Sequence, residues 1–236
     1  MSEQLRAEPH PRAHLLAVAG LLHDVGKVLQ PAEFPLNQRV SNLRQMICPT
    51  DPKTQSSTHQ HAMYTAAALD AATTNFGGLD AEEVFRVACY HHRPNAESLD
   101  QQILARANWL ASGHDRSPHQ TTGTEPAAGL LPVLSTLSWP KRPERIRADR
   151  VFSATELNFD TECWLPRADQ NTDAYRRQYE VLAERLASGL QQKFRTPGEC
   201  IDGLLGLTER TMHAVPASRF SGHLPDVTLF DHSRIV

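Results

Sequence analysis

The sequence lacks a long apolar run, a set of paired cysteines and a clear excess of either charge. No stretch approaches the roughly 18 consecutive apolar residues of a membrane span, and residues 1–12 contain no apolar segment of a secretion signal. The four cysteines are scattered without a C-x-x-C pair, so they predict free thiols rather than a disulfide framework or a zinc finger. We therefore expect a cytoplasmic protein that makes no membrane contact.

The charge balance excludes one class of nucleic-acid binder. With 24 basic and 27 acidic residues the net charge is -3, so the chain has no broad basic field with which to coat DNA or RNA. A nucleic-acid substrate remains compatible with this balance, because a bound divalent metal supplies positive charge at the site itself. Histidine is the unusual count, with 12 residues in 236.

Most of the chain has the apolar periodicity of helices. Val18 and Leu22 belong to a pattern that predicts a helix over residues 12–30, with Gly26 near its end or at a kink. Residues 151–159 fit either a short strand or an irregular segment. Further helices are predicted over residues 37–47, 57–76, 79–92, 97–113, 172–194, 198–215 and 224–236. The predicted fold class is all-α.

Capping residues mark the starts of two of these helices. Ser57 or Thr58 is expected to cap the helix over 57–76, and the glycine pair at 77–78 is expected to stop it. Asp80 is expected to cap the next helix, whose first turn is acidic. Both helices carry histidines near one end, so these boundaries decide where the histidine side chains lie.

The composition divides the chain into four parts. Residues 1–113 hold the predicted core helices, and residues 114–145 are rich in Pro, Thr, Gly and charge, which is typical of a mobile connection. Residues 146–224 form an additional helical region, and residues 225–236 begin a further helix.

The motif LLHDVGK, at residues 21–27, places His23 and Asp24 side by side at the end of an apolar helix. Either these polar groups cap a turn or they hold a metal. Divalent metals that activate water take imidazole nitrogens and carboxylate oxygens from several elements. His61, the doublet His91-His92 and His232 each fall on a different predicted element, in the order HD-x-GK, H, HH. This order favours a site for one or two metal ions.

A single histidine on an apolar face is more often a hydrogen-bonded structural residue than a metal ligand. We therefore assign a structural role to the histidines outside the motif, which are His10, His14, His59, His114, His119, His213 and His223.

The segments LLHDVGK, HQHAMYTAAAL, YHHRP and LARANWLASGHDR resemble the HD superfamily of metal-dependent phosphohydrolases. More narrowly, the sequence resembles the N-terminal HD nuclease domain of the large subunit of type III CRISPR effector complexes. The C-terminal stretch AVPASRFSGHLPDVTLFDHSRIV resembles the segment that follows the HD domain in that family. The resemblance implies an all-α HD-domain helical bundle that is circularly permuted and has additional C-terminal helices.

The resemblance also implies roles for individual residues. Asp24 would bridge two metals, His23 and His232 would bind one of them, and the other would take the three remaining histidines, His61, His91 and His92. Asp231 would be a first-turn residue of the terminal helix. Lys27 would either pair with the scissile phosphate or lie in solvent at the end of its helix.

Two departures from the family pattern stand out. Asn108 occupies the position of a family aspartate that would complete the metal ligands, and its neutral oxygen holds a divalent ion more weakly. The chain also ends at Val236, without the palm domains and the Gly-Gly-Asp-Asp motif of the family's full subunit. We therefore expect a fragment or a split form of that subunit, and residues 225–236 would lead toward an absent palm domain.

The implied function is hydrolysis of single-stranded DNA phosphodiesters by a type III CRISPR complex that has bound its target RNA. The cofactor would be one or two divalent transition metals, Mn²⁺, Ni²⁺ or Co²⁺. The implied partners are the palm domains, the small subunit, and the guide and target RNAs of the complex. Two alternatives stay open: a stand-alone HD phosphohydrolase acting on nucleotides, and a catalytically weakened HD domain with a structural role.

Overall fold

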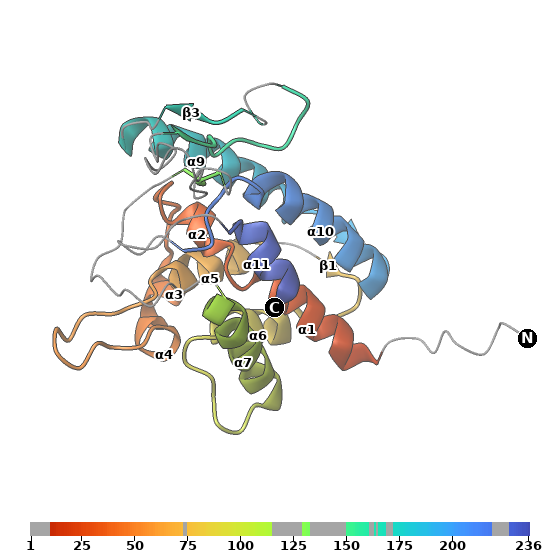
Figure 1. The fold of residues 1–236 in the computed structure, drawn as a ribbon. Helices are drawn as coiled ribbons and strands as arrows, with labels where there is room; N and C mark the ends of the chain where they lie inside the picture. Colours follow the sequence, from red (N-terminus) through yellow and green to blue (C-terminus); the bar gives the residue numbers. More distant parts are fainter. Residues whose placement is uncertain are drawn as a thin grey trace, which may run out of the picture.

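Helix α1 (Pro11–Leu22) and the short helix α2 (Gly26–Leu29) form the centre of the fold in this computed structural model (Figure 1). The structure describes residues 10–72, 75–114, 129–132, 150–160, 163, 165–168, 172–218 and 227–236. The helix predicted over 12–30 is broken by a turn at residues 23–25, which confirms the kink near Gly26. The two motif residues, His23 and Asp24, lie in this turn.

Three helices from the first half of the chain pack around this centre. They are α5 (His61–Ala71), α6 (Ala81–Cys89) and α7 (Leu99–His114). Asp80 caps α6 as predicted, because its carboxylate accepts a hydrogen bond from the Glu82 amide. The helix predicted over 37–47 is divided at Leu43 into α3 (Gln38–Asn42) and α4 (Arg44–Ile47).

The predicted boundaries of α5 are wrong at both ends. Neither Ser57 nor Thr58 caps it, because Thr58 donates both its amide and its hydroxyl hydrogen to the Pro49 carbonyl. Residue His59 has a φ of 55°, a left-handed conformation that cannot continue a helix. At the other end the chain becomes extended at Ala72, well before the glycine pair at 77–78.

The residues after α5 leave the helix because they pair with a distant segment. Strand β1 (Asn75–Phe76) lies parallel to β4 (Lys193–Phe194). A further pair, β2 (Arg150–Val151) and β3 (Arg167–Ala168), is antiparallel. Residues 151–159 were expected to form a short strand or an irregular segment. Val151 belongs to β2 and Phe152 makes a single bridge to Leu130, whereas residues 153–159 are irregular.

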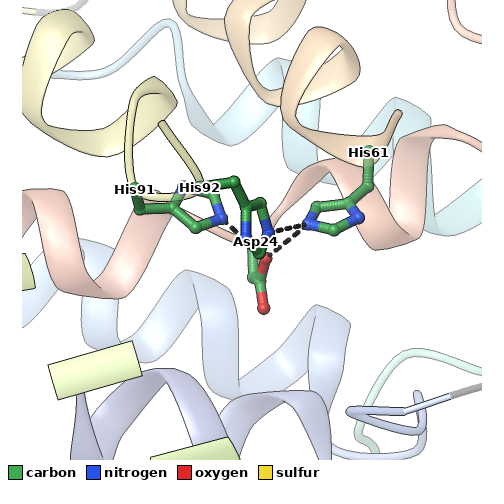
Figure 2. A group of neighbouring side chains, drawn as sticks. All are labelled: Asp24, His61, His91 and His92. Atoms are coloured by element: carbon green, nitrogen blue, oxygen red, sulfur yellow. Dashed lines mark hydrogen bonds and ion pairs between the residues drawn. The ribbon is translucent and has the colours of Figure 1, made fainter. Parts of the chain in front are cut away.

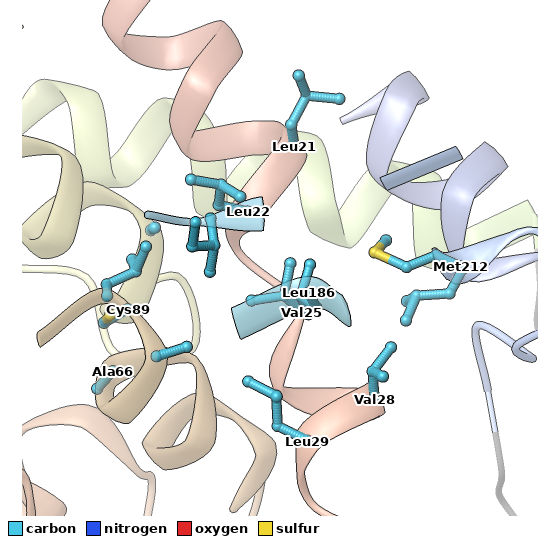
Figure 3. Close-up of a cluster of buried hydrophobic side chains, with 14 of the residues drawn as sticks. Leu21, Leu22, Val25, Val28, Leu29, Ala66, Cys89, Leu186 and Met212 are labelled. Carbon is cyan, nitrogen blue, oxygen red and sulfur yellow. The ribbon is translucent and has the colours of Figure 1, made fainter. Parts of the chain in front are cut away.

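The C-terminal helices share one core with α1 and α2. Helix α9 (Thr172–Gly189) packs on α2, while α10 (Pro197–Met212) and α11 (Leu229–Ile235) pack on α1 (Figure 1). Figure 3 shows the result, with the side chains of Leu186 and Met212 lying beside those of Leu22, Val25 and Val28. The all-α prediction is therefore confirmed, and the circular permutation stays a prediction.

The remaining expectations concern the connection, the cysteines and membrane-spanning helices. The connection predicted over residues 114–145 lies mostly outside the described residues. All four cysteines are buried and free, as predicted. None of the described helices is long and apolar enough to cross a membrane.

Candidate metal centre

The turn between α1 and α2 buries both motif side chains, with His23 0% and Asp24 1% exposed. The Nδ1–H of His23 donates to the Gly20 carbonyl at 2.7 Å, which directs its Nε2 toward the Asp24 carboxylate, 3.4 Å away. Helix α5 holds the turn in place, because the Thr65 hydroxyl donates to the His23 carbonyl and accepts a hydrogen bond from the Gly26 amide. The turn is therefore rigidly attached to its neighbouring helix.

One side of the Asp24 carboxylate faces three histidines (Figure 2). Its Oδ1 lies 3.1 Å from the Nε2 of His61 and 3.5 Å from the Nε2 of His91. The Nε2 atoms of His61 and His92 are 2.9 Å apart. The ring of His91 is oriented like that of His23, by an Nδ1–H that donates to the Ala88 carbonyl at 2.6 Å.

The other side of the carboxylate faces His23 and the C-terminal helix. The Nε2 of His232, on α11, lies 3.5 Å from the Oδ2 of Asp24. The same nitrogen lies 3.0 Å from the Oδ1 of Asn108, on α7. His91 and His92 lie in the turn after α6 rather than within the helix, so residues from α5, α7, α11 and two turns meet at Asp24. Asp231 lies in the first turn of α11, where its amide donates a hydrogen bond to the Thr228 hydroxyl and its carboxylate accepts one from that hydroxyl.

Lys27 is bound within the site rather than solvated at a helix end. Its Nζ lies 2.6 Å from the Oδ2 of Asp24 and donates to the Ala217 carbonyl at 2.8 Å. The side chain is only 18% exposed. Lys27 therefore neutralises the buried carboxylate and also connects it to the segment that leads into α11.

The electrostatics keep the carboxylate charged and three imidazoles neutral. Burial alone would raise the pKa of Asp24, but the charge of Lys27, together with the nearby imidazoles of His23 and His61, holds that pKa well below its usual range. Burial lowers the pKa of His61 to about 3 and also lowers the pKa values of His91 and His92. The neighbouring histidines lower the pKa of His92 further. Neutral imidazole is the form that binds metal.

The residues fit a divalent cation. Several buried side-chain atoms have no hydrogen-bond partner within the described residues, and three of them face one another in this cluster: the Nε2 of His23, the Nε2 of His91 and the Oδ1 of Asp24. Leaving such atoms unsatisfied is costly unless a further group binds them. Two groups of side chains could each hold a metal ion, because the ligand atoms within each group all lie within 4.8 Å of one another. One group is Asp24 with His61, His91 and His92, and the other is Asp24 with His23 and His232.

The structure places one further histidine beside the cluster, although the sequence assigned it a structural role. The ring of His59 lies 3.9 Å from that of His92, centroid to centroid. The only signal in the sequence was its position two residues before His61, and that spacing would put the two rings on different faces of a helix. Of the other histidines, His10 caps α1 and His213 ends α10, whereas His119 and His223 lie outside the described residues.

Residues 1–113 match the family model of the HD domain. This part of the chain, slightly less than half of its length, is similar to the HD domain family. The HD family consists of metal-dependent hydrolases that bind divalent metals, which agrees with the donor atoms gathered around Asp24. The match ends before α11, so the HD domain model does not include His232.

Solved structures with the same fold cover nearly the whole chain. Csm1 from T. onnurineus is 20% identical over 97% of this chain, with a TM-score of 0.58. The Csm1–Csm4 cassette in complex with cA4 is 20% identical over 95% of this chain, with a TM-score of 0.52. The present chain spans about a quarter of the length of each of those two chains, 27% in each case. No curated protein matches its sequence.

Proposed function

We propose that this chain is the nuclease domain of a type III CRISPR large subunit and hydrolyses single-stranded DNA phosphodiesters with a divalent transition metal. The observation that carries the proposal is the buried Asp24 carboxylate, which has histidine nitrogens on both sides. The HD domain supports a metal-dependent hydrolase. The fold that the chain shares with Csm1, a type III CRISPR large subunit, supports the narrower assignment.

In this proposal the two sets of ligand atoms would hold Mn²⁺, Ni²⁺ or Co²⁺, with Asp24 common to both. A bound ion of this kind polarises a phosphoryl oxygen and lowers the pKa of a water molecule. The protein contributes imidazoles that are already neutral and a carboxylate that is already ionised. Lys27 holds the carboxylate by an ion pair, and in this proposal its positive charge would pair with a phosphate oxygen of the substrate.

The proposed partners follow from the same assignment. Csm1 occurs with Csm4 in the solved cassette. By analogy, this domain would work beside the palm domains of a large subunit and a small subunit, within a complex that carries guide and target RNA. Its substrate would be single-stranded DNA.

A structural role is the second candidate, and Asn108 favours it. The amide oxygen of Asn108 lies within hydrogen-bonding distance of His232, where a carboxylate would add a negative charge to the site. A domain with this weaker ligand set could serve mainly to hold neighbouring subunits. The measurement that separates the two candidates is metal-dependent cleavage.

The test is cleavage of end-labelled single-stranded DNA by the metal-stripped chain, with and without added Mn²⁺. We expect Mn²⁺ to restore cleavage, and we expect Asp24→Asn to abolish it, because the variant removes the charge at nearly constant volume. His10→Ser is the matched control, because it removes an exposed histidine and keeps a side chain that can cap α1. Cleavage by Asp24→Asn at the wild-type rate would overturn the assignment, and metal-dependent hydrolysis of nucleotides alone would favour a stand-alone phosphohydrolase.

A further inference from the structure

His92 is held differently from the other histidines of the cluster. The rings of His23 and His91 are each fixed by an Nδ1–H that donates to a carbonyl three residues earlier. Within the described residues, His92 makes one hydrogen bond, from its Nε2 to the Nε2 of His61. Its orientation therefore depends on contacts with the faces of its ring.

Two rings contact those faces. The centroid of His91 lies 4.0 Å from that of His92, with an angle of 50° between the planes. The centroid of His59 lies 3.9 Å away, at 38°. His91 is buried, whereas His59 is exposed, so His59 covers His92 from the solvent side. Such ring contacts stabilise one orientation of a side chain that would otherwise rotate.

The backbone around His59 is built to present this ring. Its φ of 55° is a conformation that few residues other than glycine adopt. The thiol of Cys48 donates to the His59 carbonyl at 3.7 Å. The Thr58 hydroxyl donates to the Pro49 carbonyl, so it accepts a hydrogen bond from the Nδ1–H of His59 at 2.9 Å. The ring and its backbone are therefore both fixed.

We propose that His59 is a positioning residue for the metal ligand His92: stacking of its ring holds the Nε2 of His92 toward His61 and Asp24. The inference rests on the proposed metal-dependent function. It assigns His59 a role through its ring face, with no bond from His59 to the metal. Residues that orient a ligand change metal affinity about 10- to 100-fold when they are replaced.

Three variants of His59 separate the effect of its ring on metal binding from the effect of its left-handed backbone. His59→Asn removes the ring and tolerates the left-handed backbone, and His59→Gly removes the ring and relieves that backbone. His59→Phe keeps a ring but has no nitrogen. Co²⁺ is titrated into each metal-stripped protein by calorimetry and by visible absorption, which reports the ligand geometry. Thermal unfolding of each metal-free variant shows that it is folded.

We expect His59→Asn and His59→Gly to weaken the tightest Co²⁺ binding by about tenfold or more, with an altered absorption spectrum. His59→Phe is expected to bind within about threefold of wild type and to keep the spectrum. Wild-type binding by His59→Asn would overturn the proposal. So would a loss in His59→Phe equal to that in His59→Asn, because His59 would then act through a nitrogen.

A second measurement makes the failure of this inference distinct from the failure of the proposed function. In the metal-free protein, the Hε1 resonance of His92 should shift in His59→Asn, because the ring current of His59 is lost, and His59→Phe should retain a ring-current shift. If this pattern is seen and Co²⁺ affinity does not change, the positioning role is wrong while the metal site stands. If the wild-type chain binds no metal, the proposed function and this inference both fall.

Discussion

The Nε2 of His232 lies 3.0 Å from the Oδ1 of Asn108, which joins the last helix to α7 across 124 positions of the sequence. An amide oxygen only accepts hydrogen bonds, so in this contact the Nε2 of His232 carries the hydrogen. A nitrogen that donates to Asn108 cannot bind a metal at the same time. Metal binding through the Nε2 of His232 would therefore break its hydrogen bond to Asn108.

Asn108→Asp should strengthen metal binding on the His232 side of Asp24. A carboxylate adds a negative charge beside the ion and can itself become a ligand, so we expect affinity for Mn²⁺ to rise about tenfold, or about 1.4 kcal/mol. Calorimetric titration of the metal-stripped protein measures this change. Asn108→Ala is the control, which removes the amide and adds no charge. Equal Mn²⁺ affinity in all three proteins would show that position 108 does not contribute to the site.

Gly26→Ala should disrupt the site through the backbone. A Cβ at this position would overlap the carbonyl group of His61 and lie 2.7 Å from the amide nitrogen of Thr65. Helix α2 would have to move away from α5, so we expect a loss of about 3 kcal/mol in the free energy of unfolding. The same movement would separate Asp24 from His61. Urea unfolding and metal titration test the two effects.

Gly206→Ala is the matched control for that variant. Gly206 lies within α10, and a Cβ there would meet no atom within 4 Å. Alanine is favoured over glycine in a helix by about 0.5–1 kcal/mol, so this variant should be as stable as wild type or slightly more stable. A similar loss in both variants would show that the effect is general and does not come from the contact with α5.

The residues gathered around Asp24 could be chosen from the sequence because their chemistry is visible in residue types. Histidine and aspartate are costly at the ends of apolar helices, so His23, Asp24 and His61 indicated a function before any contact was known. The all-α class followed from apolar spacing. The boundaries of α5 were missed because they depend on distant partners, namely the Pro49 carbonyl for Thr58 and β4 for β1.

The role of Lys27 shows what local sequence cannot provide. From the sequence, Lys27 could either pair with a scissile phosphate or lie in solvent at the end of its helix. The contact that shows its side chain to be held inside the site comes from Ala217, 190 residues away, and the contact with a phosphate stays a prediction. His59 was missed for a related reason, because a left-handed backbone turns its ring toward His92.

Lys27→Met should destabilise the metal-free protein more than the metal-bound one. The variant leaves the buried Asp24 charge without its closest cation, at a cost of about 3 kcal/mol. A bound divalent ion supplies replacement charge, so the loss should be smaller with saturating Mn²⁺. Urea unfolding in EDTA and in Mn²⁺ measures both losses. Lys53→Met, at an exposed position, should change neither value, and an equal loss for Lys27→Met in the two conditions would contradict this account.

The stability of the metal-free protein should fall as the pH is lowered below about 6.5. The pKa of His61 is lowered from 6.5 to about 3 by burial, and those of His91 and His92 shift in the same direction. Between these pH values the unfolded chain binds protons that the folded chain does not, so acid favours unfolding. The lowered pKa of Asp24 adds a further loss below its usual value of 3.8.

Each buried histidine should contribute up to about 1.4 kcal/mol per pH unit to this slope. Urea unfolding in EDTA between pH 7 and pH 4.5 measures the total. His61→Gln removes one titrating group and keeps a polar side chain, so its slope should be smaller by about the contribution of one histidine. If the free energy of unfolding of the wild type stayed constant over this range, the histidines around Asp24 would titrate alike in the folded and unfolded chain. They would then be more accessible to water than their burial shows, and the closed ligand set around Asp24 would be wrong.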